Sequence, residues 1–240
     1  MAASSREPMA RVGLDPAAPD DAGSNPASGA TESLIWPQRW PARLPPLRLG
    51  VMASGQGSNF EALVQACRAG RLGAEVVQLV VNNPDCVARQ RAQRLGIPCA
   101  VLDHRQLRER RLLDQRVVEL FQALSVDLVV MAGWMRIVTP VLIGAYPDRL
   151  LNIHPSLLPS FRGVDAVGQA LAAGVRLSGC TAHLVVEEVD AGPILAQACV
   201  PVQEDDDHSS LSERIQRQEH RILPLAVALA AARLATGRTE

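Results

Sequence analysis

From Leu47 onward, short apolar runs alternate with segments of helical periodicity, and this alternation constrains the fold more than any other feature. Apolar runs of strand length lie at 47–53, 76–81, 99–102 and 128–132, with helical patterns between them at 60–69, 85–95 and 107–124. Strands that are apolar throughout are typical of a parallel sheet whose two faces are both covered by helices. The sequence therefore predicts an α/β fold with a doubly wound, mostly parallel sheet.

The pattern changes after one more expected strand at 150–154. We expect a helix near 164–173, strands near 181–186 and 194–200, and a terminal helix from about Ser209 to Ala232. Glycines mark the turns between these elements. The expected architecture is a single domain over residues 47–240, in which a β-rich C-terminal part and a terminal helix close over the edge of the sheet.

Residues 1–46 are a different kind of sequence, rich in Ala, Pro, Ser, Gly and Asp and without sustained periodicity. Such composition is typical of disorder. The segment has no apolar core of a secretory signal, and its acidic residues disfavour a transit peptide. We expect a disordered N-terminal extension without a function of its own.

Composition excludes several classes of function. A formal net charge of −1 and an aromatic share of 3% do not suit a nucleic-acid surface. Five cysteines occur without a C-x-x-C pair, which argues against a zinc site or a disulfide framework and fits a reduced, cytoplasmic setting. No apolar stretch approaches the roughly 20 residues that a membrane span needs. We expect a cytoplasmic protein with no metal and with neither nucleic acid nor membrane as a partner.

The loop Ser54-Gly55-Gln56-Gly57-Ser58-Asn59 follows the first expected strand and precedes a helix. Two glycines permit a tight turn, Ser58 is a good N-cap residue, and a helix N-terminus offers free N–H groups to an anion. No lysine stands at the Walker position, and Phe60 replaces the third glycine of a dinucleotide fingerprint. The loop suits a small phosphorylated ligand, although a plain capped turn remains an alternative.

The run from Asn152 to Pro159 (N-I-H-P-S-L-L-P) is followed well downstream by Asp190 in an E-E-V-D-A-G-P turn. Asn152 and His154 lie two residues apart, so both side chains point to the same side of an extended strand, and Pro155 favours that extended conformation. An amide can stabilise an oxyanion, a histidine can relay protons, and a carboxylate can orient that histidine. These groups suffice to move an acyl group between two nitrogens without a metal or a covalent intermediate. The alternatives are a satisfied polar histidine and an ordinary turn aspartate.

Together with Gly57-Ser58-Asn59, Met135-Arg136-Ile137 and Gln218-Glu219-His220, these motifs occur in an order and spacing that resemble the phosphoribosylglycinamide formyltransferase family from Leu47 to the C-terminal helix. The resemblance implies a Rossmann-like formyltransferase domain. It also implies transfer of a formyl group from the co-substrate 10-formyltetrahydrofolate to the amine of glycinamide ribonucleotide, in de novo purine (IMP) biosynthesis. No metal is implied, and the protein would act as a monomer or homodimer.

The resemblance also implies roles for individual residues. The catalytic residues would be Asn152, His154 and Asp190. Residues that bind glycinamide ribonucleotide would be Gly57, Ser58, Asn59, Gln216, Arg217, Gln218 and Glu219. Residues that bind the folate would be Arg110, Met135, Arg136, Ile137, Val138, Asn152, Val186, Glu187, Glu188 and Val189. The Leu158–Pro159 bond falls where the family tends to have a cis proline.

Two positions depart from the family pattern: Asp165 and Val167 stand where many members have histidines, whereas His183 matches a family histidine near the site. A 10-formyltetrahydrofolate hydrolase would share the catalytic trio but lack the phosphate loop and have a regulatory module in front. A methionyl-tRNA formyltransferase would require a further C-terminal domain and a basic surface. A metabolite-sensing α/β module would require the trio to be incidental. The loop at Gly57 favours the ribonucleotide enzyme.

Overall fold

The computed structural model describes residues 34–41 and 46–236. The described strands are β1 (Ile35–Trp36), β2 (Leu47–Ala53), β3 (Ala74–Val81), β4 (Cys99–Val101), β5 (Leu128–Met131), β6 (Leu150–His154), β7 (Leu177–Leu184) and β8 (Ile194–Pro201). The described helices are α1 (Ser58–Arg68), α2 (Val87–Leu95), α3 (Arg110–Ala123), α4 (Pro140–Ala145), α5 (Ala166–Ala172) and α6 (His208–Thr236).

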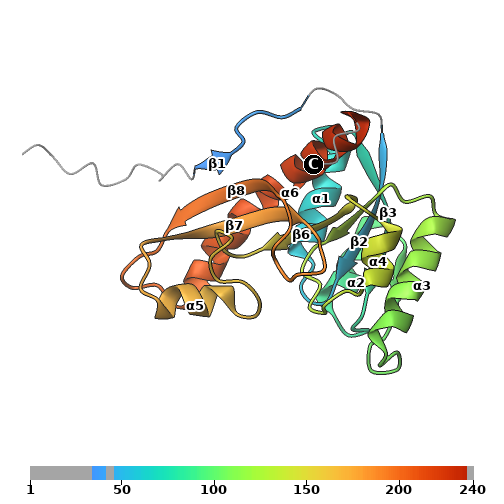
Figure 1. The fold of residues 1–240 in the computed structure, drawn as a ribbon, viewed down its shortest axis with the longest axis horizontal. Coiled ribbons are helices and arrows are strands. Elements are labelled where there is room, and N and C mark those ends of the chain that lie inside the picture. Colours follow the sequence, from blue (N-terminus) through green and yellow to red (C-terminus); the bar gives the residue numbers. More distant parts are fainter. Residues whose placement is uncertain (1–33, 42–45, 237–240) are drawn as a thin grey trace, which may run out of the picture. The chain divides into compact units, whose positions relative to one another are not determined.

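These strands form one sheet in the order β1-β8-β7-β6-β5-β2-β3-β4 (Figure 1). The five strands from β6 to β4 run parallel, and β7, β8 and β1 join the other edge in antiparallel pairing. This arrangement confirms the predicted mostly parallel sheet with a β-rich C-terminal part. The chain proceeds outward from β2 to β4 and then returns to place β5 on the other side of β2. The carboxyl ends of β2 and β5 therefore flank a topological switch point, where open α/β sheets bind ligands.

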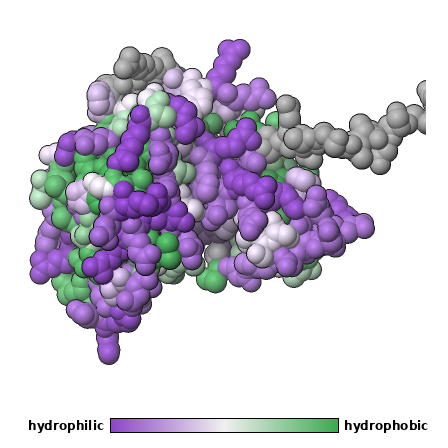
Figure 2. All heavy atoms as spheres, turned by 180° about the vertical axis from the view of Figure 1, so that it is seen from behind, coloured by the Kyte–Doolittle hydropathy of each residue, from purple (hydrophilic) through white to green (hydrophobic). Residues whose placement is uncertain are grey.

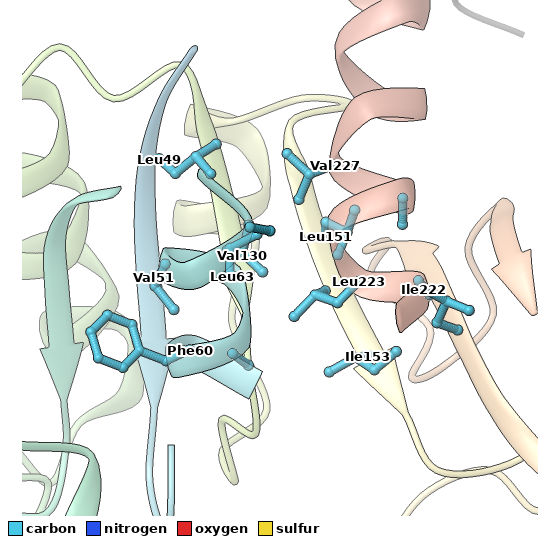
Figure 3. Close-up of a cluster of buried hydrophobic side chains, with 14 of the residues drawn as sticks. Leu49, Val51, Phe60, Leu63, Val130, Leu151, Ile153, Ile222, Leu223 and Val227 are labelled. Carbon is cyan, nitrogen blue, oxygen red and sulfur yellow. The ribbon is translucent and has the colours of Figure 1, made fainter. Parts of the chain in front are cut away.

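Helices cover both faces of the sheet because side chains on each buried strand alternate between them. On β2, Leu49 and Val51 pack in a core with α1, α2 and α6, whereas Met52 packs in a second core with α3 and α4. Figure 3 shows side chains of α1 and α6 directed toward β2 and β6 in the first core. Hydrophilic residues cover most of the face seen in Figure 2, with smaller hydrophobic patches between them. The predicted doubly wound arrangement follows from this alternation.

Local details differ from the sequence predictions. Gly57, in the left-handed conformation, is the N-cap of α1, so Ser58 is the first helical residue instead of the cap. The helix α4 was not predicted because six residues beginning with proline are too few to show periodicity. The strand β7 begins at Leu177, four residues before the expected start, because its antiparallel partner β8 reaches that far.

The expected N-terminal extension is described only in part. Within it, Ile35 and Trp36 form β1 by pairing with Ala198 and Gln197 of β8, so the expectation of disorder does not hold for this short stretch. Composition gave no sign of β1 because pairing with a distant strand fixes it. Residues 1–33 and 42–45 of the extension lie outside the described residues.

Two further findings concern the described part of the chain alone. Among its helices, none combines the length and apolar character needed to cross a membrane. Within the same residues, no three or more histidine, cysteine, aspartate or glutamate side chains gather in a way that could hold a metal ion.

Candidate active site

Asn152 and His154 lie at the end of β6, on the same face of the sheet. Their neighbours Leu151 and Ile153 point into the core with α1 and α6, so the two polar side chains face the opposite way. The antiparallel strand β7 places His183 opposite Asn152 and Thr181 opposite His154. The predicted common orientation of Asn152 and His154 is therefore present, and a second histidine joins them.

Both ring nitrogens of His154 face oxygen atoms. Nε2 donates to the carbonyl oxygen of Phe161 at 2.8 Å. Nδ1 lies 3.4 Å from Oδ2 of Asp190, and the His154 side chain is only 7% exposed. The carboxylate is therefore at ion-pair distance from the imidazole, and a protonated ring would have an acceptor at each nitrogen.

Asp190 reaches the site from the loop between β7 and β8, where it adopts a left-handed conformation with φ of 52°. Its Oδ2 accepts a hydrogen bond from the Gly163 backbone N–H at 2.9 Å, and its Oδ1 lies 3.5 Å from Nε2 of His183. Burial raises the pKa of Asp190, but the His183 and Gly163 contacts and the nearby charge of His154 outweigh it, so the pKa is lowered. The group is therefore a carboxylate at neutral pH.

His183 connects Asn152 with Asp190. Its Nδ1 donates to the carbonyl oxygen of Leu184 at 2.9 Å, and its Nε2 lies 3.2 Å from the Asn152 amide nitrogen. A neutral His183 accepts a hydrogen bond from Asn152, whereas a protonated one directs Nε2–H toward Asp190. His183 therefore links the three predicted residues, so that Asn152, His183, Asp190 and His154 form one connected series of side chains. Sequence reasoning placed His183 near the site but gave it no role, because a lone histidine on a strand carries little signal.

A buried polar layer supports the loop that follows His154. Thr181 Oγ1 donates to the carbonyl oxygen of Ser156 at 2.7 Å and accepts from the backbone N–H of Leu158 at 3.0 Å. Gln197 on β8 donates to Thr181 and to the carbonyl oxygen of Leu158, both at 3.0 Å. The Leu158–Pro159 peptide bond is cis, as the family resemblance implied. Side chains of β7 and β8 therefore fix the loop that carries the acceptor for His154.

The loop predicted to bind phosphate, residues 54–59 (hereafter the phosphate loop), follows β2 and packs against α2. Gly57 has φ of 70°, and a Cβ atom on it would lie 2.6 Å from the Cβ of Ala88. The backbone N–H of Ala88 donates to the carbonyl oxygen of Gly55 at 3.0 Å, and Arg91 Nε donates to that of Gln56 at 2.8 Å. Glycine is therefore required at position 57 both by conformation and by space, as the sequence indicated.

Asn59 and Glu219, both predicted to bind the ribonucleotide, meet across 160 residues of sequence. Asn59 Nδ2 donates to Glu219 Oε2 at 2.8 Å, and both side chains are buried. Burial raises the pKa of Glu219, and the hydrogen bond from Asn59 offsets only part of that effect. Gln216 and Arg217 lie on the exposed side of α6, and Arg217 pairs with Glu213 one turn away. Gln218 is half-buried.

Besides Asn152 on β6, the residues predicted to bind the folate lie on three separate segments. Met135 and Ile137, which follow β5, are 74% and 55% exposed despite being apolar, whereas Arg136 and Val138 are half-buried. The neighbouring Trp134 is buried in the second core. Large apolar side chains that are exposed to solvent beside a polar site suit a flat, partly apolar ligand.

Arg110 is the first residue of α3. It and the segment after β5 both lie near the buried carboxyl group of Asp114. Asp114 Oδ2 accepts a hydrogen bond from the backbone N–H of Thr139 at 2.6 Å. Burial raises the pKa of Asp114, although the bonds to Thr139 and the charges of Arg136 and Arg110 oppose that rise. Both arginines therefore belong to one neighbourhood.

The third segment, at 186–189, is exposed throughout. It is linked to the loop after His154 by an ion pair in which Arg162 Nη1 lies 2.7 Å from Glu188 Oε1. The loop that carries Asp190 therefore meets the loop that carries Gly163 at two points.

The two departures from the family pattern have local explanations. Asp165 is the N-cap of α5, accepts from the Gly168 N–H at 3.1 Å, and pairs with His208 at 3.0 Å on the surface. Val167 is buried in the first core. Neither residue contacts the trio in the bonds described above.

Comparisons with known proteins identify the family to which the chain belongs. The sequence profile described as formyl transferase matches residues 47–227. The phosphoribosylglycinamide formyltransferase of Bacillus subtilis (strain 168) is 37% identical over 180 residues, which cover 75% of this chain and 92% of the relative. The trifunctional purine biosynthetic protein adenosine-3 of Gallus gallus is 43% identical over 185 residues, or 77% of this chain. The chain spans only 18% of that longer relative.

Solved structures with the same fold include glycinamide ribonucleotide transformylase 1 from Symbiobacterium toebii, with 44% identity and a TM-score of 0.76. The match covers 78% of this chain and 88% of that one. Phosphoribosylglycinamide formyltransferase from Bacillus halodurans has 39% identity and a TM-score of 0.73, with 80% and 97% of the two chains covered. The chain therefore belongs to the formyl transferase family.

Proposed function

We propose that the protein transfers the formyl group of 10-formyltetrahydrofolate to the amine of glycinamide ribonucleotide. The products are formylglycinamide ribonucleotide and tetrahydrofolate, in de novo purine (IMP) biosynthesis in the cytoplasm. The observation that carries this proposal is the position of Asp190 Oδ2, 3.4 Å from Nδ1 of a His154 that shares a strand with Asn152. Relatives of similar length named phosphoribosylglycinamide formyltransferase support the choice of substrates.

In the proposed reaction the neutral amine of the ribonucleotide attacks the formyl carbon attached to N10 of the folate. A C–N bond forms, and the carbonyl oxygen becomes the oxyanion of a tetrahedral intermediate. The Asn152 amide and a protonated His154 stabilise that oxyanion, and the Asp190 carboxylate stabilises the imidazolium. Collapse of the intermediate breaks the bond to N10 as a proton passes from the attacking to the departing nitrogen. These steps use side chains alone and require no metal.

Substrate binding would change the hydrogen bonds of the ligand-free site. Nε2 of His154 donates to the carbonyl oxygen of Phe161, and the Asn152 amide contacts His183. The formyl oxygen would compete with these acceptors for the two donors. Both donors come from the same face of β6, so one oxygen can meet both.

The ribonucleotide would bind with its phosphate at the N-terminus of α1, on Gly57, Ser58 and Asn59, where free N–H groups attract an anion. The residues of α6 from Gln216 to Glu219 would complete that site. Arg110, the segment 135–138, Asn152 and the loop 186–189 would hold the folate. The switch point between β2 and β5 would thus bring the two substrates to the end of β6.

The reaction itself is tested by following tetrahydrofolate formation from 10-formyltetrahydrofolate with glycinamide ribonucleotide present and absent. We expect product only when the ribonucleotide is present, because its amine is the acceptor. Equal product formation in its absence would show that water accepts the formyl group and would contradict the proposed acceptor.

Substitutions test the assigned roles. We expect Asn152→Ala and Asp190→Asn each to lower kcat by roughly 100-fold or more with little change in ground-state binding. The first variant removes an oxyanion donor, and the second leaves the other donor, His154, without the carboxylate that stabilises its imidazolium. Asp165→Asn is a matched control, because Asp165 is exposed, pairs with His208, and can be replaced by asparagine as an N-cap. Near-wild-type kcat for either site variant would remove that residue from the mechanism.

A further inference from the structure

Ser54 stands between the phosphate loop and the segment that follows β5. It comes directly after β2, three residues before Gly57, and is half-buried. Its backbone N–H donates to the carbonyl oxygen of Gly133 at 3.0 Å. Its Oγ accepts a hydrogen bond from the backbone N–H of Met135 at 2.8 Å, across 81 residues of sequence. One residue therefore makes two bonds across the switch point.

The second of these bonds requires a side chain. Backbone pairing between β2 and β5 continues as far as the bond from Ser54 to Gly133. Gly133 then takes a left-handed conformation with φ of 83°, which turns the chain away from the ladder. The hydroxyl of Ser54 reaches the Met135 N–H beyond that turn. At the other end of the segment, Asp114 accepts from Thr139, so residues 135–138 are held at both ends by side chains.

We infer that Ser54 is a positioning residue that couples the two substrate sites. The inference rests on the proposed function and adds a mechanism for cooperation between the substrates. Ribonucleotide bound at Gly57 would order the loop that begins at Ser54, and Ser54 would in turn hold Met135 in place for the folate. Ordering by the first ligand lowers the entropic cost of binding the second, which is positive cooperativity without a change of shape.

Equilibrium binding tests the coupling directly. Tetrahydrofolate is titrated into the full-length protein with and without glycinamide ribonucleotide, and Trp134 fluorescence serves as the signal because Trp134 precedes Met135. For the wild-type protein we expect the ribonucleotide to tighten tetrahydrofolate binding roughly fivefold or more, the lower range of measured couplings. Ser54→Ala should reduce that factor to about one, whereas Ser54→Thr retains an acceptor and should keep it.

The outcomes separate this inference from the function on which it rests. The coupling role is overturned if the ribonucleotide does not change the tetrahydrofolate affinity of the wild-type protein, or if Ser54→Ala shows the same change as the wild type. In either case the enzyme remains active. The coupling role is also overturned if Ser54→Ala weakens the binding of both ligands equally and leaves the coupling factor unchanged, because that result indicates a local structural role. A wild-type protein that forms no product in the transfer assay fails the proposed function instead.

Hydrogen exchange on the wild-type protein provides a test that needs no variant. Ribonucleotide alone, without folate, should slow exchange of the backbone amides at 134–138 as well as those of the phosphate loop. Protection confined to the loop would overturn the inference. Thermal melts of Ser54→Ala and Ser54→Thr in the absence of ligand show whether both variants fold like the wild type.

Discussion

Glu219 is a carboxyl group enclosed by protein, and burial raises its pKa above the ordinary value of 4.5. The neutral form therefore contributes stability that is fully present below pH 4.5 and is lost as pH rises through the raised pKa. We expect Glu219→Gln to become more stable relative to the wild type as pH rises. The glutamine oxygen can still accept from Asn59, so the comparison isolates the charge.

Urea unfolding of both ligand-free proteins at a series of pH values from about 4.5 to 8 measures this difference. A tenfold difference in proton affinity between the folded and unfolded states corresponds to about 1.4 kcal/mol of stability, which such unfolding curves resolve. Other carboxyl groups titrate equally in the two proteins and cancel in the comparison. A stability difference that stays constant across the series would show that Glu219 titrates normally.

At the residue scale, the sequence predicted the parts of the site that recur as short motifs. The spacing of Asn152 and His154 on an expected strand implied a common orientation, which the structure has. His183 was harder, because its contacts with Asn152 and Asp190 depend on the antiparallel register of β6 and β7. A long connection joins β6 to β7, so no tight turn in the sequence specifies their register.

At the scale of elements, α2 supports the phosphate loop through two contacts. Ala88 packs under Gly57, and Arg91 donates to the carbonyl oxygen of Gln56. We expect Arg91→Ala to raise the KM for glycinamide ribonucleotide roughly fivefold, the equivalent of one hydrogen bond, with kcat and the folate KM nearly unchanged. The loop would lose preorganisation without losing any proposed catalytic group.

Arg89 offers the matched control on the same helix. It is exposed and donates to the carbonyl oxygen of Pro84, outside the loop. Steady-state kinetics with each substrate varied in turn should therefore separate the two alanine variants. The support role would be wrong if Arg89→Ala raised the ribonucleotide KM as much, or if Arg91→Ala acted on the folate KM instead.

The sequence predicted the central strands of the sheet well. Strands β5 and β6 were placed to within one residue because continuous apolar runs of this length are typical of strands covered on both faces. The elements missed, α4 and β1, are short and owe their conformation to neighbours. Thr139 before α4 bonds to Asp114, and β1 pairs with β8.

At the scale of the whole molecule, strand order explains why distant motifs converge. The loop predicted to bind phosphate follows β2, the Met135 segment follows β5, and β6, which carries Asn152 and His154, is the next neighbour. Their carboxyl ends share one edge of the sheet because these strands are parallel. The sequence predicted a parallel sheet, but the order of its strands becomes visible only in the structure, since no local pattern specifies which strand lies beside β2.

The β1 pairing leads to a prediction about the N-terminal extension. The strand β8 has β7 on one side and the two-residue β1 on the other, so β1 occupies part of an edge that could otherwise pair with another chain. We propose that the extension before Leu34 has no catalytic role. Removal of residues 1–33 should then leave kcat, both KM values and the oligomeric state unchanged.

Removal of residues 1–46 takes β1 away as well and uncovers the part of the β8 edge with which it pairs, at Gln197 and Ala198. Turnover should again be unchanged, because Asp190 and β6 keep their partners, but the protein should self-associate as its concentration increases. Sedimentation velocity of the two truncated proteins at several concentrations distinguishes these behaviours. If the shorter protein sedimented like the longer one throughout, β8 would not need β1 as a cover. If removal of residues 1–33 alone lowered turnover, the extension would have a role in the reaction.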